Sequence, residues 1–143
     1  MEQQGKDFIW DVTTSEQIDM DSLWNAPGEH RQFSSGEAVI SEGDEAESMF
    51  FVLEGRLQVI KNYRTMDERY VASLKSGDLF GEMALFLREP RSATVVAVGD
   101  VTVIEIHRNT VVEFLHRNPE NAYVIVELLC KRLRNVLAAL ADY

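Results

Sequence analysis

Residues 77–97, GDLFGEMALFLREPRSATVVA, contain the pattern that decides the fold. Gly77-Asp78 is a turn signal, and Gly81 precedes a compact apolar run, residues 83–87, of about two helical turns at most. Pro90 ends that run because proline lacks a backbone N–H and clashes with the preceding turn. Residues 93–96 then have the composition of a β-strand. The stretch therefore predicts a turn, a short helix and a polar hinge that leads into a strand.

The same stretch carries the components of an anion site. A helix that follows glycine has free N–H groups and partial positive charge at its N-terminus, and glycine lets a ligand approach the backbone. Arg91 offers a planar, charged guanidinium to a phosphate, and Ser92 adds a hydroxyl. Glu82 suits a sugar hydroxyl beside the phosphate, so the pattern favours a small sugar phosphate. The alternative is an ion pair between Glu82 and Arg91 that ties the helix to the strand.

The rest of the chain predicts one domain over residues 1–143, with short strands separated by turns. Residues 1–32 are expected to be a helical lead-in, residues 33–107 a β-roll, and residues 108–143 C-terminal helices. Strands are expected at residues 38–40, 49–60 with an interruption at Glu54-Gly55, 70–74, 93–98 and 101–106, with a turn at Gly99-Asp100. Such spacing is typical of an antiparallel barrel or roll.

From Asn109 onward the apolar period becomes helical, with a short helix over residues 110–116 and a long one from Pro119 to about residue 141. One apolar row has the spacing of a coiled-coil seam, and a second row lies beside it. The spacing favours a homodimer in which one row meets a partner helix, but both rows could instead cover the protein's own barrel. The seam comprises Ala122, Val126, Leu129, Leu133, Val136 and Leu140, and the second row Ile125, Leu128 and Leu137.

Composition narrows the function classes. The chain has 24 acidic and 14 basic residues and a formal net charge of −10, without a long basic cluster, so we expect no nucleic-acid partner and no direct membrane contact. The single cysteine, Cys130, cannot form an internal disulfide. This is consistent with a reducing compartment, so we expect the protein to be cytoplasmic. His30, His107 and His116 are scattered. We therefore expect surface or capping histidines, no metal, no cofactor and no enzyme activity.

Two motifs give the chain a close resemblance to a known family. Residues 80–85 (FGEMAL) and 90–94 (PRSAT) resemble the phosphate-binding cassette of the cyclic-nucleotide-binding domain family, the type in catabolite activator protein and cAMP-dependent kinase regulatory subunits. Residues 36–40 and 49–59 resemble its first hairpins, and the resemblance spans roughly residues 33–134. It implies an antiparallel β jelly-roll, or double-stranded β-helix, with an N-terminal helix, a short phosphate-binding helix and two C-terminal helices.

The resemblance also implies a set of ligand contacts. The backbone of the short helix, the arginine and the residues after it would take the cyclic phosphate, and the glutamate and glycine before them the ribose 2′-hydroxyl. Strand residues and the last helix would enclose the base. The implied phosphate contacts are Met83, Ala84, Arg91, Ser92 and Ala93, the ribose contacts Gly81 and Glu82, and the base contacts Leu74, Leu79 and Val95, with Arg132, Leu128, Leu129 and Leu133 as candidates from the last helix.

The predicted function is a cyclic-nucleotide sensor that signals through its C-terminal helices. In the family a threonine after the arginine favours cGMP. Ser92 stands at that place, which favours cAMP as the ligand and leaves cGMP open. The chain would be a stand-alone sensor or a regulatory domain linked to an effector domain. The alternative function is a ligand-free module for dimerisation and protein docking. The presence of Arg91 and Glu82 favours the sensor over this alternative.

Overall fold

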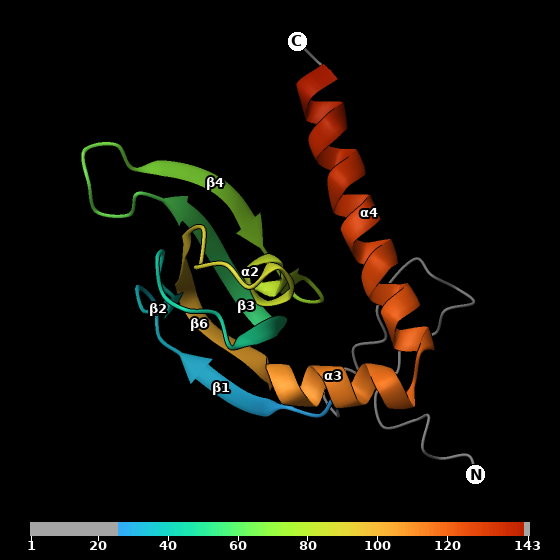
Figure 1. Ribbon diagram of the computed structural model, residues 1–143. Helices are drawn as coiled ribbons and strands as arrows, with labels where there is room; N and C mark the ends of the chain where they lie inside the picture. The colour runs from blue at the N-terminus through green and yellow to red at the C-terminus, as the bar shows by residue number, and fades with distance from the viewer. Residues whose placement is uncertain (1–25, 142–143) are drawn as a thin grey trace.

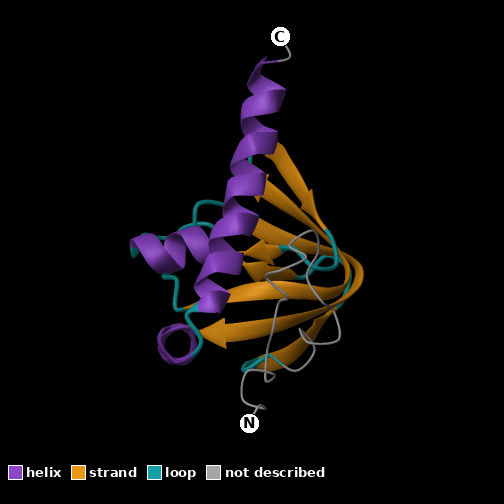
Figure 2. Ribbon diagram, turned by 90° about the vertical axis from the view of Figure 1, so that its right-hand side faces the viewer, coloured by secondary structure: helices purple, strands orange, loops and turns teal. Residues whose placement is uncertain are grey.

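A curved antiparallel sheet with helices along one side is the architecture of the computed structural model, which describes residues 26–141 (Figures 1 and 2). The helix expected before residue 26 lies outside the described residues. The strands are β1 (Glu29–Phe33), β2 (Ala38–Ile40), β3 (Ser48–Lys61), β4 (Arg69–Leu74), β5 (Leu79–Phe80) and β6 (Thr94–His107), and the helices are α2 (Glu82–Leu87), α3 (Arg108–Arg117) and α4 (Glu120–Ala141).

The sheet runs in the order β1-β6-β3-β4, with β2 also paired to β6 and β5 to β3, and every pairing is antiparallel. This confirms the prediction of a mainly β fold with flanking helices. The prediction was wrong about the start of the roll, because β1 begins at Glu29 inside the expected helical lead-in. Its sequence, EHRQF, is almost entirely exposed and lacks the apolar alternation that marks a strand.

The turn expected at Gly99-Asp100 is instead a bend within one long strand. β6 continues through Gly99 and pairs with β3 on both sides of it, and the register of β3 shifts on either side of Glu54. Gly55 has φ +95°, and a Cβ there would lie 2.4 Å from the Asp100 carbonyl oxygen. The glycines therefore mark one bulge shared by two paired strands, where the chain bends without reversing.

Two apolar clusters occupy opposite faces of the sheet, because successive side chains of a strand alternate between its faces. The inner cluster lies within the roll and comprises Phe50, Val52, Leu57, Leu74, Phe80, Val95, Ala97, Val101 and Val103. The outer cluster joins the sheet to the helices and includes Met49, Phe51, Leu53, Leu79, Leu85, Ile104, Ile106, Val111, Phe114, Val124 and Ile125.

The helix α3 follows β6 without a loop and is fastened at its first residue. Arg108 donates hydrogen bonds to the carbonyl oxygens of Leu85 in α2 (2.8 Å) and Ala46 in the β2–β3 loop (2.9 Å). These bonds hold the beginning of α3 against the end of α2.

Only the first part of α4 packs on the outer cluster, and the helix then extends past the roll (Figure 1). Of the predicted seam, Val126, Leu133, Val136 and Leu140 are each more than half exposed. The alternative in which both apolar rows cover the protein's own barrel is therefore wrong, because most of one row packs against nothing in the described chain. No helix in the described part of the chain is long and apolar enough to cross a membrane.

Candidate functional site

The short helix α2 begins at a glycine that no other residue could replace without strain. Gly81 has φ +80°, and a Cβ at this position would lie 2.9 Å from Nη1 of Arg91. The helix buries Glu82, Ala84 and Leu85. It ends at Leu87, where Arg88 takes the left-handed conformation, so the chain has left the helix before it reaches Pro90.

Arg91 is a buried cation at the centre of the site, only 5% exposed. Its Nη1 donates to the Gly81 carbonyl (2.7 Å) and its Nη2 to the Ser48 carbonyl (2.9 Å). Burial lowers the pKa of Arg91, although the charges of Glu105, Asp44 and Glu82 oppose that shift. Two neutral carbonyls orient the guanidinium without neutralising it, which leaves its remaining N–H donors for an anion.

The loop before β3 supports the segment that carries Arg91. The backbones of Arg91 and the loop bond in both directions, from Arg91 N to the Asp44 carbonyl (2.8 Å) and from Gly43 N to the Arg91 carbonyl (2.9 Å). Lys61 donates to the Ser92 carbonyl (2.9 Å) and pairs with Glu42 (2.7 Å). A side-chain hydrogen bond from Lys61 lowers the pKa of Glu42. The loop before β3 thus fixes the backbone of the segment that carries Arg91.

Glu82 is a buried carboxylate with one oxygen in use. It is 2% exposed, and its Oε2 accepts a hydrogen bond from Arg132 of α4 at 2.7 Å. Its Oε1 is buried and has no hydrogen-bond partner among the residues that the structure describes. Leaving such an oxygen unpaired costs about 1–3 kcal/mol or more, so it is free to accept a hydrogen bond from a group that enters the cavity.

The ion pair that ties the short helix to another element is not the expected one. Glu82 pairs with Arg132, whose Nη2 also donates to the Leu79 carbonyl, whereas Arg91 bonds to backbone carbonyls. The Glu82–Arg91 alternative is therefore wrong for the structure, in which α4 supplies the partner of the glutamate.

A cavity of about 250 Å³ opens beside these charged groups. A space of this size fits one small molecule, and its walls are mainly apolar with a few polar groups at one end, as is usual for ligand sites. The lining residues are Ile40, Val59, Val71, Ala72, Leu74, Phe80, Gly81, Glu82, Met83, Ala84, Arg91, Ser92, Ala93, Val95 and Arg132.

Of the four candidates from the last helix, only Arg132 lines the cavity, because Leu128 and Leu129 pack on the outer cluster and Leu133 is more than half exposed. The structure brings together the other predicted site residues with one exception. Leu79 does not line the cavity and belongs to the outer cluster, whereas its neighbour Phe80 lines the cavity. The two are consecutive in β5, so their side chains must point to opposite faces. The prediction placed the side chain on the wrong face because a strand of two residues carries no readable alternation.

Several wall residues were missed from the sequence, namely Ile40, Val59, Val71, Ala72 and Phe80. The sheet register explains part of the wall: Val59 of β3 pairs with Ala72 of β4 on one side and with Val95 of β6 on the other. Such a row can be found only once the pairing of strands is known, because each residue alone reads as an ordinary core position.

Residues 30–118 match the cyclic nucleotide-binding domain family, and the chain belongs to that family. The expected family and fold class are thereby confirmed.

Two relatives and one solved structure illustrate the likeness. The cyclic AMP receptor protein of Thermus thermophilus is 31% identical over 106 residues, which are 74% of this chain and 49% of that protein. The cAMP-dependent protein kinase regulatory subunit of Mycosarcoma maydis is 45% identical over 71 residues, 50% of this chain and 13% of that subunit. The crystal structure of the Thermus thermophilus catabolite activator protein superposes with a TM-score of 0.71 at 30% identity, covering 80% of this chain and 54% of that one. The chain thus spans about half the length of the receptor protein and a much smaller share of the kinase subunit.

Proposed function

We propose that this chain is a cAMP sensor that binds one cyclic nucleotide in the cavity between α2, the inner face of the roll and α4. One observation carries the proposal: two buried charged groups, Arg91 and Glu82, line the same cavity, and each has hydrogen-bonding capacity that the described residues do not satisfy. The names of the relatives, a cyclic AMP receptor and a cAMP-dependent kinase subunit, support cAMP as the ligand.

In this arrangement the guanidinium of Arg91 and the backbone N–H groups of Met83 and Ala84 bind the cyclic phosphate, with Ser92 and Ala93 beside them. Gly81 and Glu82 bind the ribose, and the 2′-hydroxyl donates to Oε1 of Glu82. The apolar walls, including Leu74, Val95 and Phe80, enclose the base. Binding then satisfies the buried oxygen and places an anion against the N–H donors of Arg91 that Gly81 and Ser48 do not use.

We further propose that the signal leaves through α4. Glu82 would hold both the ribose hydroxyl and the guanidinium of Arg132, so occupancy of the cavity changes the environment of a residue fixed to α4. A ligand can shift a helix only if its affinity differs between two arrangements, and a shared carboxylate provides such a difference.

The exposed seam of α4 supports a homodimer, in which the α4 helices of two copies pack together. An effector domain on a longer chain is the other partner that we propose. We expect a cytoplasmic binding protein without catalytic activity, and without direct contact to nucleic acid or membrane.

Calorimetric titration of cAMP into nucleotide-free protein tests the proposal. Wild type should bind saturably, and Arg91→Lys should weaken binding by at least about 100-fold, since lysine keeps the charge but loses the planar fork. Arg88→Lys, the same change at an exposed arginine of the same segment, should leave the affinity unchanged. A folded wild-type protein that gives no heat with cAMP or cGMP would overturn the sensor proposal and favour the docking module.

A double-mutant cycle isolates the ribose contact. 2′-Deoxy-cAMP should bind wild type roughly tenfold or more weakly than cAMP, the scale of a hydrogen bond to a charged group. In Glu82→Gln that difference should shrink, because the acceptor charge is gone. An undiminished difference in the variant would exclude Glu82 as the partner of the 2′-hydroxyl.

Selectivity and transmission have separate tests. Ser92→Thr should raise cGMP affinity relative to cAMP if position 92 contacts the base.

Hydrogen exchange along α4 should respond to cAMP in wild type and respond less in Arg132→Met, while Arg134→Met, an exposed neighbour in the same helix, should behave as wild type. An equal response in both variants would contradict a route through Arg132.

A further inference from the structure

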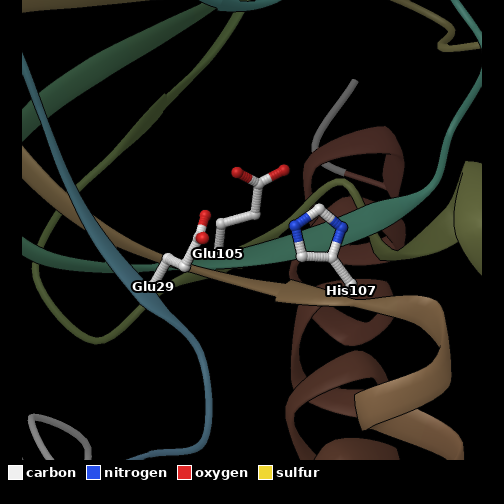
Figure 3. A group of neighbouring side chains, drawn as sticks. All are labelled: Glu29, Glu105 and His107. Carbon is white, nitrogen blue, oxygen red and sulfur yellow. The ribbon is translucent and has the colours of Figure 1, made fainter.

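We propose a second site, for a divalent transition-metal ion, formed by Glu29, Glu105 and His107 at the end of the sheet where β6 becomes α3. The ligand-bearing atoms of the three side chains lie within 4.8 Å of one another. Figure 3 shows the three side chains rising on the same side of the sheet, Glu29 from β1 and the other two from β6.

The positions of the three residues in the paired strands bring these groups together. Glu105 and His107 are two apart in β6 and therefore share a face, and Glu29 lies directly opposite Glu105 in the antiparallel register. Cross-strand partners have Cβ atoms about 4.5–5.5 Å apart. Two residues on one strand and one on its neighbour thus form a triangle of donors over a rigid surface, which is how a metal site is held in a defined geometry.

Glu105 is already oriented as a metal-binding carboxylate should be. It is 8% exposed, its Oε2 accepts from the Ser48 hydroxyl at 2.6 Å, and its Oε1 accepts from Arg31 at 2.7 Å. Each oxygen has a further lone pair, and carboxylates that bind metals are typically fixed by such outer hydrogen bonds.

His107 and Glu29 supply the adjustable donors. Both residues are exposed, and His107 makes no side-chain capping bond although it stands at the N-cap of α3. Zinc bonds to nitrogen and oxygen are about 2.0–2.2 Å, so these two side chains must close in slightly around the ion. Their exposure allows that movement without disturbing the core.

The donor set and its charge select the kind of ion. Two carboxylates and Arg31 sum to a single negative charge beside the imidazole of His107, which favours a cation. One imidazole with two carboxylates suits Zn²⁺ and its transition-metal neighbours better than calcium or magnesium, which prefer oxygen ligands alone. Three protein ligands leave a coordination position for water.

Zn²⁺ titration by calorimetry, in a Cys130→Ser background that removes an exposed thiol, tests the proposal. The parent should bind one ion, and the ion should raise its unfolding temperature. His107→Ala and Glu29→Gln should each weaken binding by at least about tenfold, the smallest loss expected when even an outer partner of a metal site is removed. His116→Ala removes an exposed histidine of α3 and should bind as the parent does.

Folding is checked by unfolding the metal-free variants, which should match the parent because both changed side chains lie on the surface. Two outcomes would overturn the proposal. One is the absence of Zn²⁺ binding at 100 µM or below, which is the concentration range to be titrated. The other is binding that survives both substitutions or is lost in His116→Ala, since the ion would then lie elsewhere.

Discussion

The inner and outer apolar clusters are made from the same strands and the same kinds of residue, yet they serve different purposes. The inner cluster is not covered on all sides by protein, since Leu74, Phe80 and Val95 also line the cavity. The outer cluster is closed by α3 and the first turns of α4. One face of the sheet is thus arranged to receive a ligand, and the other to hold helices.

The segment containing β5 and α2 is where the two clusters meet. Phe80 belongs to the inner cluster, whereas Leu79 and Leu85 belong to the outer one. A change in the cavity at this segment therefore reaches the helix-covered face within one or two residues. In this segment the alternation of side chains between the two clusters connects the cavity to the helix packing.

The largest expected effects come from truncating the two neighbours in β5. Phe80→Ala should lower the free energy of unfolding by about 3–5 kcal/mol and Leu79→Ala by about 2–5 kcal/mol, because each leaves a cavity in a packed cluster. Only Phe80→Ala should also weaken cAMP binding, since only Phe80 lines the cavity. Denaturant unfolding and calorimetry on both variants check this. Equal losses of affinity would show that the two faces are not separable here.

A smaller effect is expected from Gly81→Ala. The left-handed conformation costs an alanine about 1–2 kcal/mol, and the new methyl group would press on Arg91. Gly36→Ala is the matched control, because Gly36 has φ +90° and nothing within 4 Å of an added Cβ. Both should lose similar stability from the backbone, while affinity for cAMP should fall only in Gly81→Ala. A matching loss of affinity in Gly36→Ala would argue against the contact with Arg91.

The stability of the monomer should hardly change when α4 is altered beyond the outer cluster. Val136→Glu places a charge on the exposed seam and should convert a dimer to a monomer, with unfolding changed by no more than about 0.5 kcal/mol. Asn135→Glu adds the same charge at an exposed position outside the seam and should remain dimeric. Light scattering after size exclusion measures both. A wild-type monomer would contradict the proposed homodimer.

The smallest expected effect concerns Glu105, a buried charge at the rim of the inner face. Burial alone would raise its pKa, but the hydrogen bonds from Ser48 and Arg31, together with the charge of Arg31, help to outweigh burial, and the pKa is lowered from its ordinary value. A carboxyl with a lower pKa in the folded state stabilises the protein above its unfolded pKa, and this contribution is lost as the pH falls through the folded value.

Glu105→Gln cannot titrate, so its unfolding free energy should fall less than that of wild type between pH 7 and about pH 3. Glu54→Gln, an exposed glutamate of β3, is the control and should follow wild type. Identical acid profiles for wild type and Glu105→Gln would show that the bonds to Ser48 and Arg31 contribute nothing net.

Much of the candidate site could be read from the chain because its members are close in sequence. Gly81, Glu82 and Arg91 belong to one stretch whose glycine, helix and hinge follow from local conformational preferences. The resemblance added Arg132 as a candidate, and the structure puts its guanidinium on Glu82, 50 residues away in sequence.

The strand register could not be predicted from local conformational preferences. A bulge shifts every following side chain to the other face, and the bulge at Gly55 and Gly99 could not be told from a turn by composition. The apolar wall, the exposed edge strand β1 and the grouping of His107 with two glutamates all depend on that register.

The class of fold, the components of a predicted anion site and the two apolar rows of the last helix could be recognised in the chain alone, because each depends on residues within a few turns or strands of one another. The unpaired carboxylate oxygen, the opposite faces taken by Leu79 and Phe80, and the length of α4 that remains exposed became visible only with the packed fold. The physical reason is that these outcomes depend on contacts between distant segments, whose pairing minimises buried unpaired groups and empty space across the whole fold.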